Sequence, residues 1–288
     1  MNGILVVNKP LGYTSREIVN IVSKKMGTKK IGHTGTLDPK ASGVLVLCIG
    51  NALKMIQLMD DYDKEYMAEG ILGMATDTLD TDKNATVLEE KNVDIKEDAI
   101  IKTIRSFKGK YRQQVPLYSA VKVNGKKLYE YARSNIPVDL PFKEVEIKDI
   151  EMVDEITYRG GKIYFKIRCT VSKGTFIRVL ISDIGDRLKV PAVMNSLIRT
   201  RIGNFNIDDS YSLEDIQNGN YKLINITDAF VNIKRIMVDD DMASKISNGV
   251  ILDRFFEDDM AFILDKDGNL LAIYKNVDNK SRPYKMFI

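Results

Sequence analysis

Short apolar runs separated by glycine and proline organise the N-terminal part of the chain. The first run ends at Lys9-Pro10-Leu11-Gly12, which predicts a strand over residues 3–8 followed by a turn. Ser15 is a suitable helix N-cap, and apolar residues recur after it at helical spacing until Gly27, which predicts a helix. A polar, glycine-rich loop then leads to the apolar run 43–50, which has the length of a buried strand.

The central part of the chain switches repeatedly between helical and strand-like periodicity. The expected elements are, in order, a short helix at 52–59, a strand at 65–75, a polar loop at 76–95, an amphipathic helix at 96–107, a strand at 115–123, a short helix at 126–133, alternating strands at 143–158 and 162–171, a helix at 174–188 and a strand at 199–207. The two alternating strands flank Arg159-Gly160-Gly161, which predicts a β-hairpin.

The pattern changes after Ile226. Residues 234–288 contain short apolar segments, among them 261–264 and 270–274, on either side of a polar loop with a glycine. Such segments are typical of a small β-rich unit. The chain is therefore expected to belong to the α+β class, with a large main domain and a small β appendage behind it.

The composition limits the chemistry that the chain can perform. Its 288 residues include one histidine, His33, and two cysteines, Cys48 and Cys169, each inside an apolar run. Zinc sites built from clustered histidine and cysteine are thereby excluded, and a histidine-activated nucleophile would depend on His33 alone. An enzyme of this composition would use a carboxylate. We expect two buried free thiols, neither a signal peptide nor a membrane span, and a cytoplasmic location.

The net charge of +3 hides a strong segregation of charge along the chain. Three basic blocks, at 1–40, 102–133 and 159–207, alternate with three acidic blocks that fill the rest of the sequence. If the basic blocks converge in the fold, they form a surface suited to a polyanion such as nucleic acid. The alternative, that the charges only solvate separate surfaces, stays open at this point.

One polar loop, Gly32-His33-Thr34-Gly35-Thr36-Leu37-Asp38-Pro39, contains a candidate catalytic carboxylate. Taken alone, an aspartate before proline is ordinary turn chemistry. The loop is, however, one of a series of motifs. The others are Asn8-Lys9-Pro10-Leu11-Gly12-Tyr13-Thr14-Ser15, Ala41-Ser42-Gly43-Val44-Leu45, Lys64-Glu65-Tyr66, Thr76-Asp77-Thr78 with Asp80, Pro116-Leu117-Tyr118-Ser119-Ala120-Val121-Lys122, Lys127-Leu128-Tyr129-Glu130-Tyr131-Ala132-Arg133, Ser172-Lys173-Gly174-Thr175-Phe176-Ile177-Arg178 and Leu197-Ile198-Arg199. In content and order the series resembles the TruB-type tRNA pseudouridine-55 synthases.

The resemblance implies both a fold and a reaction. The family fold is a catalytic domain around a bent, mixed, mostly antiparallel sheet, here residues 1–230, followed by a small β-rich, PUA-like RNA-binding domain, here 231–288. The family reaction breaks the N1–C1′ bond of the uridine at position 55 in the tRNA T-loop, turns the uracil and rejoins it through C5. It needs no metal and no cofactor. The implied partner is the T-arm of tRNA. We expect a monomer, because the sequence has no heptad repeat and no long apolar stripe left over.

The resemblance also implies the catalytic residues. Asp38 is expected to be the essential carboxylate, which attacks C6, attacks C1′, or assists removal of the C1′/C2′ hydrogens; the sequence leaves all three routes open. Arg178 is expected to be its positive partner, and Tyr66 is expected to stack on the extruded base. Leu197 is expected to line the pocket and exclude water.

Further family positions imply supporting roles. His33 is expected to contact RNA near the flipped base, and Asp80 matches a family acid near the site. Lys9, grouped with the substrate-binding residues, is expected to shape the floor beneath the loop more than to touch substrate. Phe176 departs from the family, which has tyrosine there; the ring is kept and the hydroxyl is lost, so we expect a modest loss of positioning.

Extruding the target uridine costs a few kcal/mol of unstacking, which contacts with the RNA backbone must offset. Lys122 and Arg199 are among the basic residues expected along the phosphates, and binding is expected to weaken steeply with salt. Two alternatives remain: a tRNA-folding chaperone with weak or no catalysis, and a guide-RNA-dependent synthase that modifies ribosomal RNA.

Overall fold

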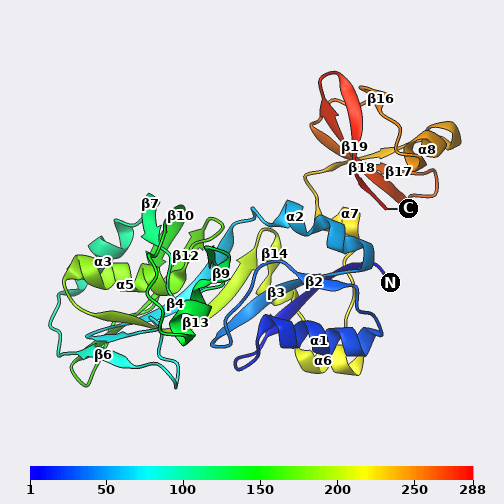
Figure 1. Ribbon diagram of the computed structural model, residues 1–288. Helices are drawn as coiled ribbons and strands as arrows, with labels where there is room; N and C mark the ends of the chain where they lie inside the picture. Colours follow the sequence, from blue (N-terminus) through cyan, green and yellow to red (C-terminus); the bar gives the residue numbers. More distant parts are fainter. Residues whose placement is uncertain (288) are drawn as a thin grey trace.

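The computed structural model describes residues 1–287, which form two large β-sheets, two small two-stranded sheets and helices packed on them (Figure 1). The N-terminal half contains β1 (Gly3–Lys9), α1 (Ser15–Met26), β2 (Ile31–His33), β3 (Ala41–Ile49), the 3₁₀ helix η1 (Gly50–Met55), α2 (Ile56–Met59), β4 (Lys64–Leu72), β5 (Met74–Thr76), β6 (Val87–Glu90), α3 (Glu97–Arg105), β7 (Gly109–Gln114), β8 (Lys122–Val123), β9 (Lys126–Lys127) and α4 (Leu128–Arg133). Among these residues and the rest of the described chain, no helix is long and apolar enough to cross a membrane.

The second half completes the main sheet and adds a smaller one. Its elements are β10 (Phe142–Met152), β11 (Thr157–Arg159), β12 (Lys162–Val171), α5 (Ile177–Leu188), β13 (Ala192–Ile202), β14 (Phe205–Asn206), η2 (Ile207–Asp209), α6 (Leu213–Asn218), α7 (Ile226–Ala229), β15 (Lys234–Met237), α8 (Asp240–Ser247), β16 (Leu252–Asp253), β17 (Met260–Leu264), β18 (Leu270–Val277) and β19 (Lys280–Met286). This is the α+β architecture that the sequence predicts.

The main sheet has the strand order β1-β3-β13-β4-β12-β10-β7, with β2 beside β3. The pairing of β13 with β3 is parallel and the other pairings in this sheet are antiparallel, so the predicted mixed, mostly antiparallel sheet is confirmed. The parallel contact requires a glycine: a Cβ on Gly43 would lie 2.2 Å from the backbone oxygen of Arg199. This close approach places the loop before β3 next to the ends of β4 and β13.

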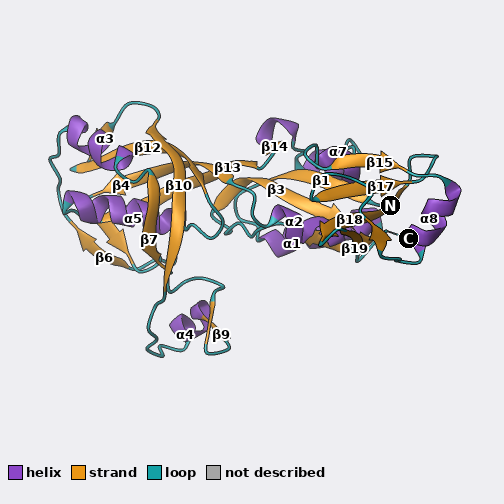
Figure 2. Cartoon of the chain, turned by 90° about the horizontal axis from the view of Figure 1, so that it is seen from above, coloured by secondary structure: helices purple, strands orange, loops and turns teal. Residues whose placement is uncertain are grey.

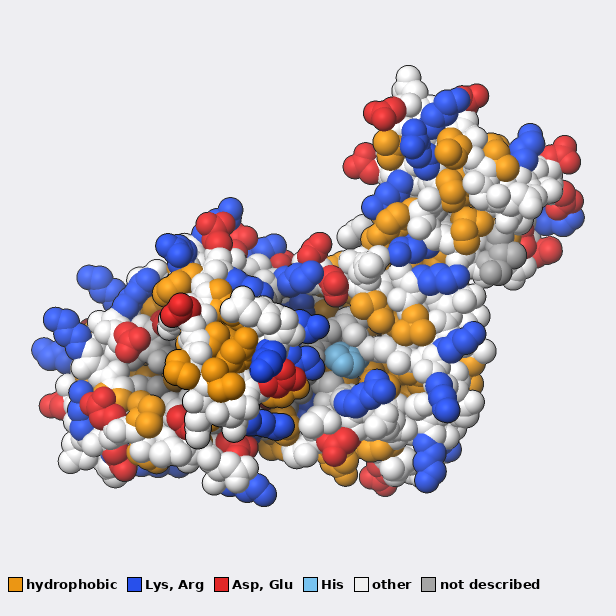
Figure 3. All heavy atoms as spheres, in the orientation of Figure 1, with side chains coloured by type: hydrophobic (Ala, Val, Ile, Leu, Met, Phe, Trp, Pro, Cys, Tyr) orange, Lys and Arg blue, Asp and Glu red, His pale blue; other side chains and the backbone are white. Residues whose placement is uncertain are grey.

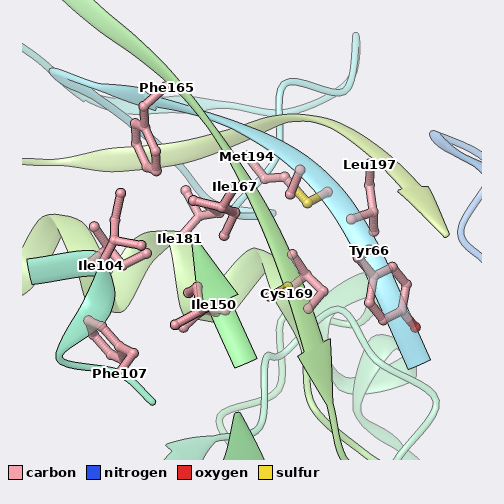
Figure 4. Packing of buried hydrophobic residues seen from close by; sticks show 14 of the residues in the cluster. Tyr66, Ile104, Phe107, Ile150, Phe165, Ile167, Cys169, Ile181, Met194 and Leu197 are labelled. Carbon is pink, nitrogen blue, oxygen red and sulfur yellow. The ribbon is translucent and has the colours of Figure 1, made fainter. Parts of the chain in front are cut away.

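Helices α3 and α5 cover one face of the sheet at its β7 end. Figure 4 shows Ile104 of α3, Phe107 just after α3 and Ile181 of α5 in the same buried cluster as Phe165 and Ile167 of β12. These side chains are buried, and complete burial of one such side chain contributes roughly 1.5–3 kcal/mol to folding. The core therefore holds α5 rigidly on the sheet.

The C-terminal sheet has the order β15-β17-β18-β19-β16 and stands at the end of the molecule that carries both chain termini (Figure 1). Phe262, Ile273 and Phe287 of this unit share a hydrophobic cluster with Met55 and Phe230 of the main part. The small β unit expected behind the main domain is therefore present. The exact boundary at residues 230 and 231 stays a prediction, and so does a role for this unit in binding RNA.

Several predicted elements are shifted or interrupted. Of the strand expected at 115–123, only the last two residues form a strand, β8; the longer strand of this region is β7, which lies before it and whose Lys, Arg and Gln residues at the sheet edge give no apolar signal. Residues 115–141 instead form an arm with β8, β9 and α4 that projects from the body (Figure 2). Gly73 interrupts the strand expected at 65–75, and the strand expected at 199–207 begins earlier and is interrupted at Gly203.

The helix start predicted at Ser15 differs by one residue. Thr14 is the N-cap of α1 and forms a capping box with Glu17, which satisfies two free backbone N–H groups. This leaves the buried Ser15 hydroxyl free for a contact outside the helix. Cys48 and Cys169 are buried and unpaired, as predicted, and burial raises the pKa of each thiol to about 12.

Candidate active site

The loop between β2 and β3 presents Asp38 to a pocket, and its backbone is held at several points. The Ser15 hydroxyl donates to the carbonyl of Leu37 at 3.1 Å and accepts from the Leu37 N–H at 2.8 Å. The Ala41 N–H donates to the Asp38 carbonyl at 3.0 Å. The Asp38 side chain is 50% exposed, so the carboxylate is available to a ligand although its backbone is fixed. The anchoring role of Ser15 has no signal in the sequence, because a serine at a helix start fits a cap equally well.

Arg178 lies beside Asp38, as predicted, and is fixed by two further contacts. Its Nη2 is 3.3 Å from Oδ2 of Asp38, and its side chain is 8% exposed. Nη1 donates to the carbonyl of Thr78 at 2.7 Å, and Nη2 donates to the carbonyl of Tyr118 at 2.9 Å. Hydrogen bonds to charged groups contribute about 1.5–3 kcal/mol each. The guanidinium therefore has a fixed orientation before any ligand binds.

Asp38 and Arg178 form part of the wall of a pocket of about 310 Å³. The other lining residues are Thr36, Leu37, Tyr66, Tyr118, Ser119, Ala120, Val121, Thr175, Phe176, Ile177 and Leu197. Figure 4 shows the Tyr66 and Leu197 side chains next to each other at one end of the core cluster, on β4 and β13. The walls are therefore largely apolar and partly aromatic, with one carboxylate and one guanidinium, which suits a flat polar ring that is held while its bonds change.

Asp80 lies behind the pocket and reaches Arg178 through a turn. Its Oδ1 accepts from the Thr78 hydroxyl at 2.8 Å and from the Asp82 N–H at 3.0 Å, and the residue is 7% exposed. Leu79 in this turn has a left-handed φ of 61°, an uncommon conformation for a branched residue that the surrounding contacts must maintain. Asp80, the acid predicted near the site, thus holds the turn that contains Thr78. The Thr78 carbonyl in turn holds Arg178.

Replacing Asp80 by alanine is expected to lower the turnover number by about tenfold, since small displacements of a positioned group are costly in catalysis. The loss of both hydrogen bonds frees the turn, so the Thr78 carbonyl no longer fixes Arg178. Single-turnover kinetics with saturating protein measure the effect. Asp82→Ala is the matched control, because its carboxylate accepts from the Asn84 N–H and has no link to Arg178. Equal rates for both variants would contradict this role of Asp80.

Two predicted substrate-binding residues are buried beneath the loop. Arg199 is 1% exposed; its Nε donates to the Val44 carbonyl at 2.8 Å and its Nη2 to the Gly35 carbonyl at 3.2 Å. The prediction that Arg199 lies along RNA phosphates is therefore wrong: β13 is a central strand, and the Arg199 guanidinium supports the loop that carries Asp38 from below. Lys9 is fully buried and donates to the Pro10 and Tyr13 carbonyls, so it lies in the floor of the loop. Burial lowers the pKa of Lys9 to about 8, and the nearby Asp38 charge opposes this shift.

His33 and Lys122 lie where RNA can reach them. Figure 3 shows the single histidine, in pale blue, at the surface among basic side chains. Its pKa is lowered by burial and then by the charge of Arg199, so the ring is neutral near pH 7. Its Nδ1 has no hydrogen-bond partner within residues 1–287. Lys122 is exposed on the arm formed by residues 115–141. Their contacts with RNA stay predictions.

Comparison with known proteins adds independent evidence. Residues 23–177 match the model of the TruB family pseudouridylate synthase N-terminal domain, and residues 178–232 match that of the tRNA pseudouridylate synthase B C-terminal domain. The chain is 39% identical to tRNA pseudouridine synthase B of Bacillus subtilis (strain 168) over 286 residues, 95% of this chain and 93% of the relative. It is also 39% identical to tRNA pseudouridine synthase B of Lactobacillus johnsonii over 296 residues, 100% of this chain and 99% of the relative.

Solved structures agree with the fold. A crystal structure of a Cbf5-Nop10-Gar1 complex superposes with a TM-score of 0.71 at 25% identity, and the match covers 99% of this chain and 85% of that one. An H/ACA RNP bound to a substrate RNA containing 2′-deoxyuridine gives a TM-score of 0.70 at 23% identity, again over 99% of this chain and 85% of that one. The similarity extends over both sheets of the molecule.

Proposed function

Because this chain belongs to the TruB family of pseudouridylate synthases, we propose that it converts the T-loop uridine at position 55 of tRNA to pseudouridine. The observation that carries the proposal is the Asp38–Arg178 pair in a pocket with aromatic and apolar walls. The relatives at 39% identity are named for a tRNA substrate, which supports tRNA for this chain as well. A tRNA substrate also places the reaction in the cytoplasm.

The proposed reaction requires an ionised carboxylate with a fixed direction. The N1–C1′ bond breaks, the uracil turns within the pocket, C5 bonds to C1′, and the proton on C5 leaves while N1 becomes protonated. Arg178 is held by the Thr78 and Tyr118 carbonyls, so it aligns Asp38 without moving during the reaction. Asp38 acts at C6, at C1′ or on the sugar hydrogens, and the structure supports each route equally.

The remaining pocket residues hold the base. The Tyr66 ring stacks on the extruded uracil, a contact that contributes roughly 1–3 kcal/mol, and its hydroxyl is proposed to assist loss of the C5 proton. Leu197 excludes water from the same wall. Phe176 contributes its ring to the pocket, and the hydroxyl that it lacks is expected to cost a modest loss of positioning.

RNA recognition is proposed to use the exposed surface around the pocket. His33 contacts RNA next to the extruded base, Lys122 contacts phosphates from the arm at 115–141, and the C-terminal unit at 231–288 binds the tRNA as a PUA-like module. The protein acts as a monomer on the T-arm. Since several phosphates are neutralised, affinity is expected to fall steeply with rising salt.

The test uses unmodified tRNA transcribed with tritium at uracil C5 and incubated with the purified full chain. Formation of the C5–C1′ bond must release one equivalent of tritium per tRNA into water. Release from position 55 supports the proposal. No release with tight tRNA binding would indicate a tRNA chaperone instead. Activity that appears only when a guide RNA is added would indicate the guide-dependent alternative.

A further inference from the structure

Gln113 is a polar side chain that is 1% exposed although it lies on β7, the edge strand of the main sheet. Its amide contacts both backbone groups of one residue: the Phe176 N–H donates to its Oε1 at 2.7 Å, and its Nε2 donates to the Phe176 carbonyl at 3.1 Å. Phe176 is the N-cap residue of α5, and its own side chain makes no capping hydrogen bond. Gln113 therefore ties the start of α5 to the sheet from outside the helix.

A second contact on the same strand fixes the direction of this amide. Tyr111 lies two residues before Gln113, on the same face of β7, and its hydroxyl oxygen accepts from the Gln113 Nε2 at 2.5 Å. The Tyr111 hydroxyl lies near the Asp183 carboxylate of α5, seven residues after Phe176, and each of the two groups affects the pKa of the other. Two inward-facing residues of β7, Tyr111 and Gln113, thus face α5.

In these contacts each hydrogen-bond donor faces an acceptor. The Phe176 N–H requires an acceptor, which places the amide oxygen of Gln113 there and its NH₂ group towards the Phe176 carbonyl and Tyr111. Burial raises the pKa of Asp183 to about 6, and its interaction with the nearby Tyr111 hydroxyl opposes that shift. At neutral pH the Asp183 carboxylate is therefore mostly ionised.

We propose that Gln113 is a positioning residue of the active site: by fixing the backbone of Phe176, it holds Arg178, two residues further on, against Asp38. The inference rests on the proposed function and adds to it a residue outside the pocket wall. Arg178 occupies the first turn of α5, where backbone N–H groups have no partner within the helix. Because that turn has no side-chain cap of its own, its geometry depends on the amide supplied by β7.

The test replaces Gln113 by glutamate, which has nearly the same shape. The introduced carboxylate still accepts from the Phe176 N–H but cannot donate to the Phe176 carbonyl or to Tyr111. We expect the single-turnover rate of tritium release to fall about 10- to 100-fold, as for other small misplacements of catalytic groups, with the Kd for tRNA changed by less than about threefold. Gln114→Glu is the matched control, since Gln114 is exposed on the same strand, and its rate should stay at the wild-type value.

A pH profile separates positioning from a general structural role. Protonation restores one donor to the introduced carboxyl group, and burial favours the protonated form. Relative to the wild type, the rate of Gln113→Glu should therefore recover as the pH falls from 8 to 6. Asp183 and Arg187 are the charged groups that act on Tyr111, and they are the same in the wild type and in Gln113→Glu. The inference would be overturned if the ratio of the Gln113→Glu rate to the wild-type rate did not change with pH. It would also be overturned if the variant lost only affinity for tRNA.

Tyr111→Phe provides a second variant in case Gln113→Glu does not fold. It removes one acceptor of the amide and leaves both contacts with Phe176, so a smaller loss of rate, about two- to fivefold, is expected without change in tRNA affinity. A wild-type rate in this variant counts against a role for the contact between Tyr111 and Gln113. If the wild-type protein itself releases no tritium, the proposed function fails. This outcome is distinguishable from failure of the inference about Gln113, in which the wild type is active and the variants do not lose rate as expected.

Discussion

Asp38→Asn is expected to abolish tritium release from tRNA while the protein still binds tRNA. Asparagine has nearly the same shape as aspartate and keeps an oxygen that can accept from Arg178, so the 3.3 Å contact can persist without the charge. Each of the three possible routes at Asp38 requires an ionised carboxylate, and a neutral amide serves none of them. Removal of a single essential group from a catalytic unit lowers turnover by about 10⁴-fold or more. Single-turnover tritium release with excess protein measures the loss.

Binding controls make this result specific. The Asp38 carboxylate is half exposed and its loop is held by backbone hydrogen bonds with Ser15, so the substitution leaves the loop in place. Filter binding should therefore give a tRNA Kd within about threefold of the wild type, because phosphate contacts dominate affinity. Asp82→Asn, in the neighbouring turn, should release tritium at the wild-type rate. Residual release above about one per cent of wild type in Asp38→Asn would show that this carboxylate is not essential.

The periodicity of the sequence predicts the buried elements better than those at the edges. The apolar run of β3 and the amphipathic helix α3 are found close to the expected positions because burial on one or both faces leaves a clear pattern. Strand β7 is missed because it lies at the sheet edge, where Lys110, Arg112 and Gln114 face solvent. The same strand carries Gln113, whose importance is not visible in a run of polar residues.

The arginines of the candidate site show where sequence reasoning stops. Arg178 and Arg199 both belong to family-like motifs within one basic block, and nothing in their spacing distinguishes a pocket residue from a residue beneath the loop. The distinction arises from strand order: β13 lies between β3 and β4, so Arg199 is enclosed, whereas Arg178 begins a helix that faces the pocket. The carbonyls of Thr78 and Tyr118 have no sequence signal at all, since every residue carries one.

The carbonyls of Thr78 and Tyr118 hold the Arg178 guanidinium, so a substitution that loses these contacts should have a large effect. Arg178→Lys is expected to lower the single-turnover rate about 100- to 1000-fold, although the positive charge is retained. A planar guanidinium can contact Thr78, Tyr118 and Asp38 at once, whereas a lysine ammonium on a flexible stem cannot reach all three in the same geometry. Fixed alignment of charged groups commonly accounts for rate factors of this size.

Arg187→Lys is the matched control, because Arg187 lies on the same helix and its Nη1 donates to the Ser106 hydroxyl at 2.6 Å, away from the pocket. Its rate should stay near the wild-type value. Thermal melting of both variants separates loss of alignment from loss of fold. If Arg178→Lys kept the wild-type rate, charge alone would be sufficient beside Asp38. The carbonyl contacts that orient the guanidinium, and with them the rigidity of the α5 start, would then have no catalytic consequence.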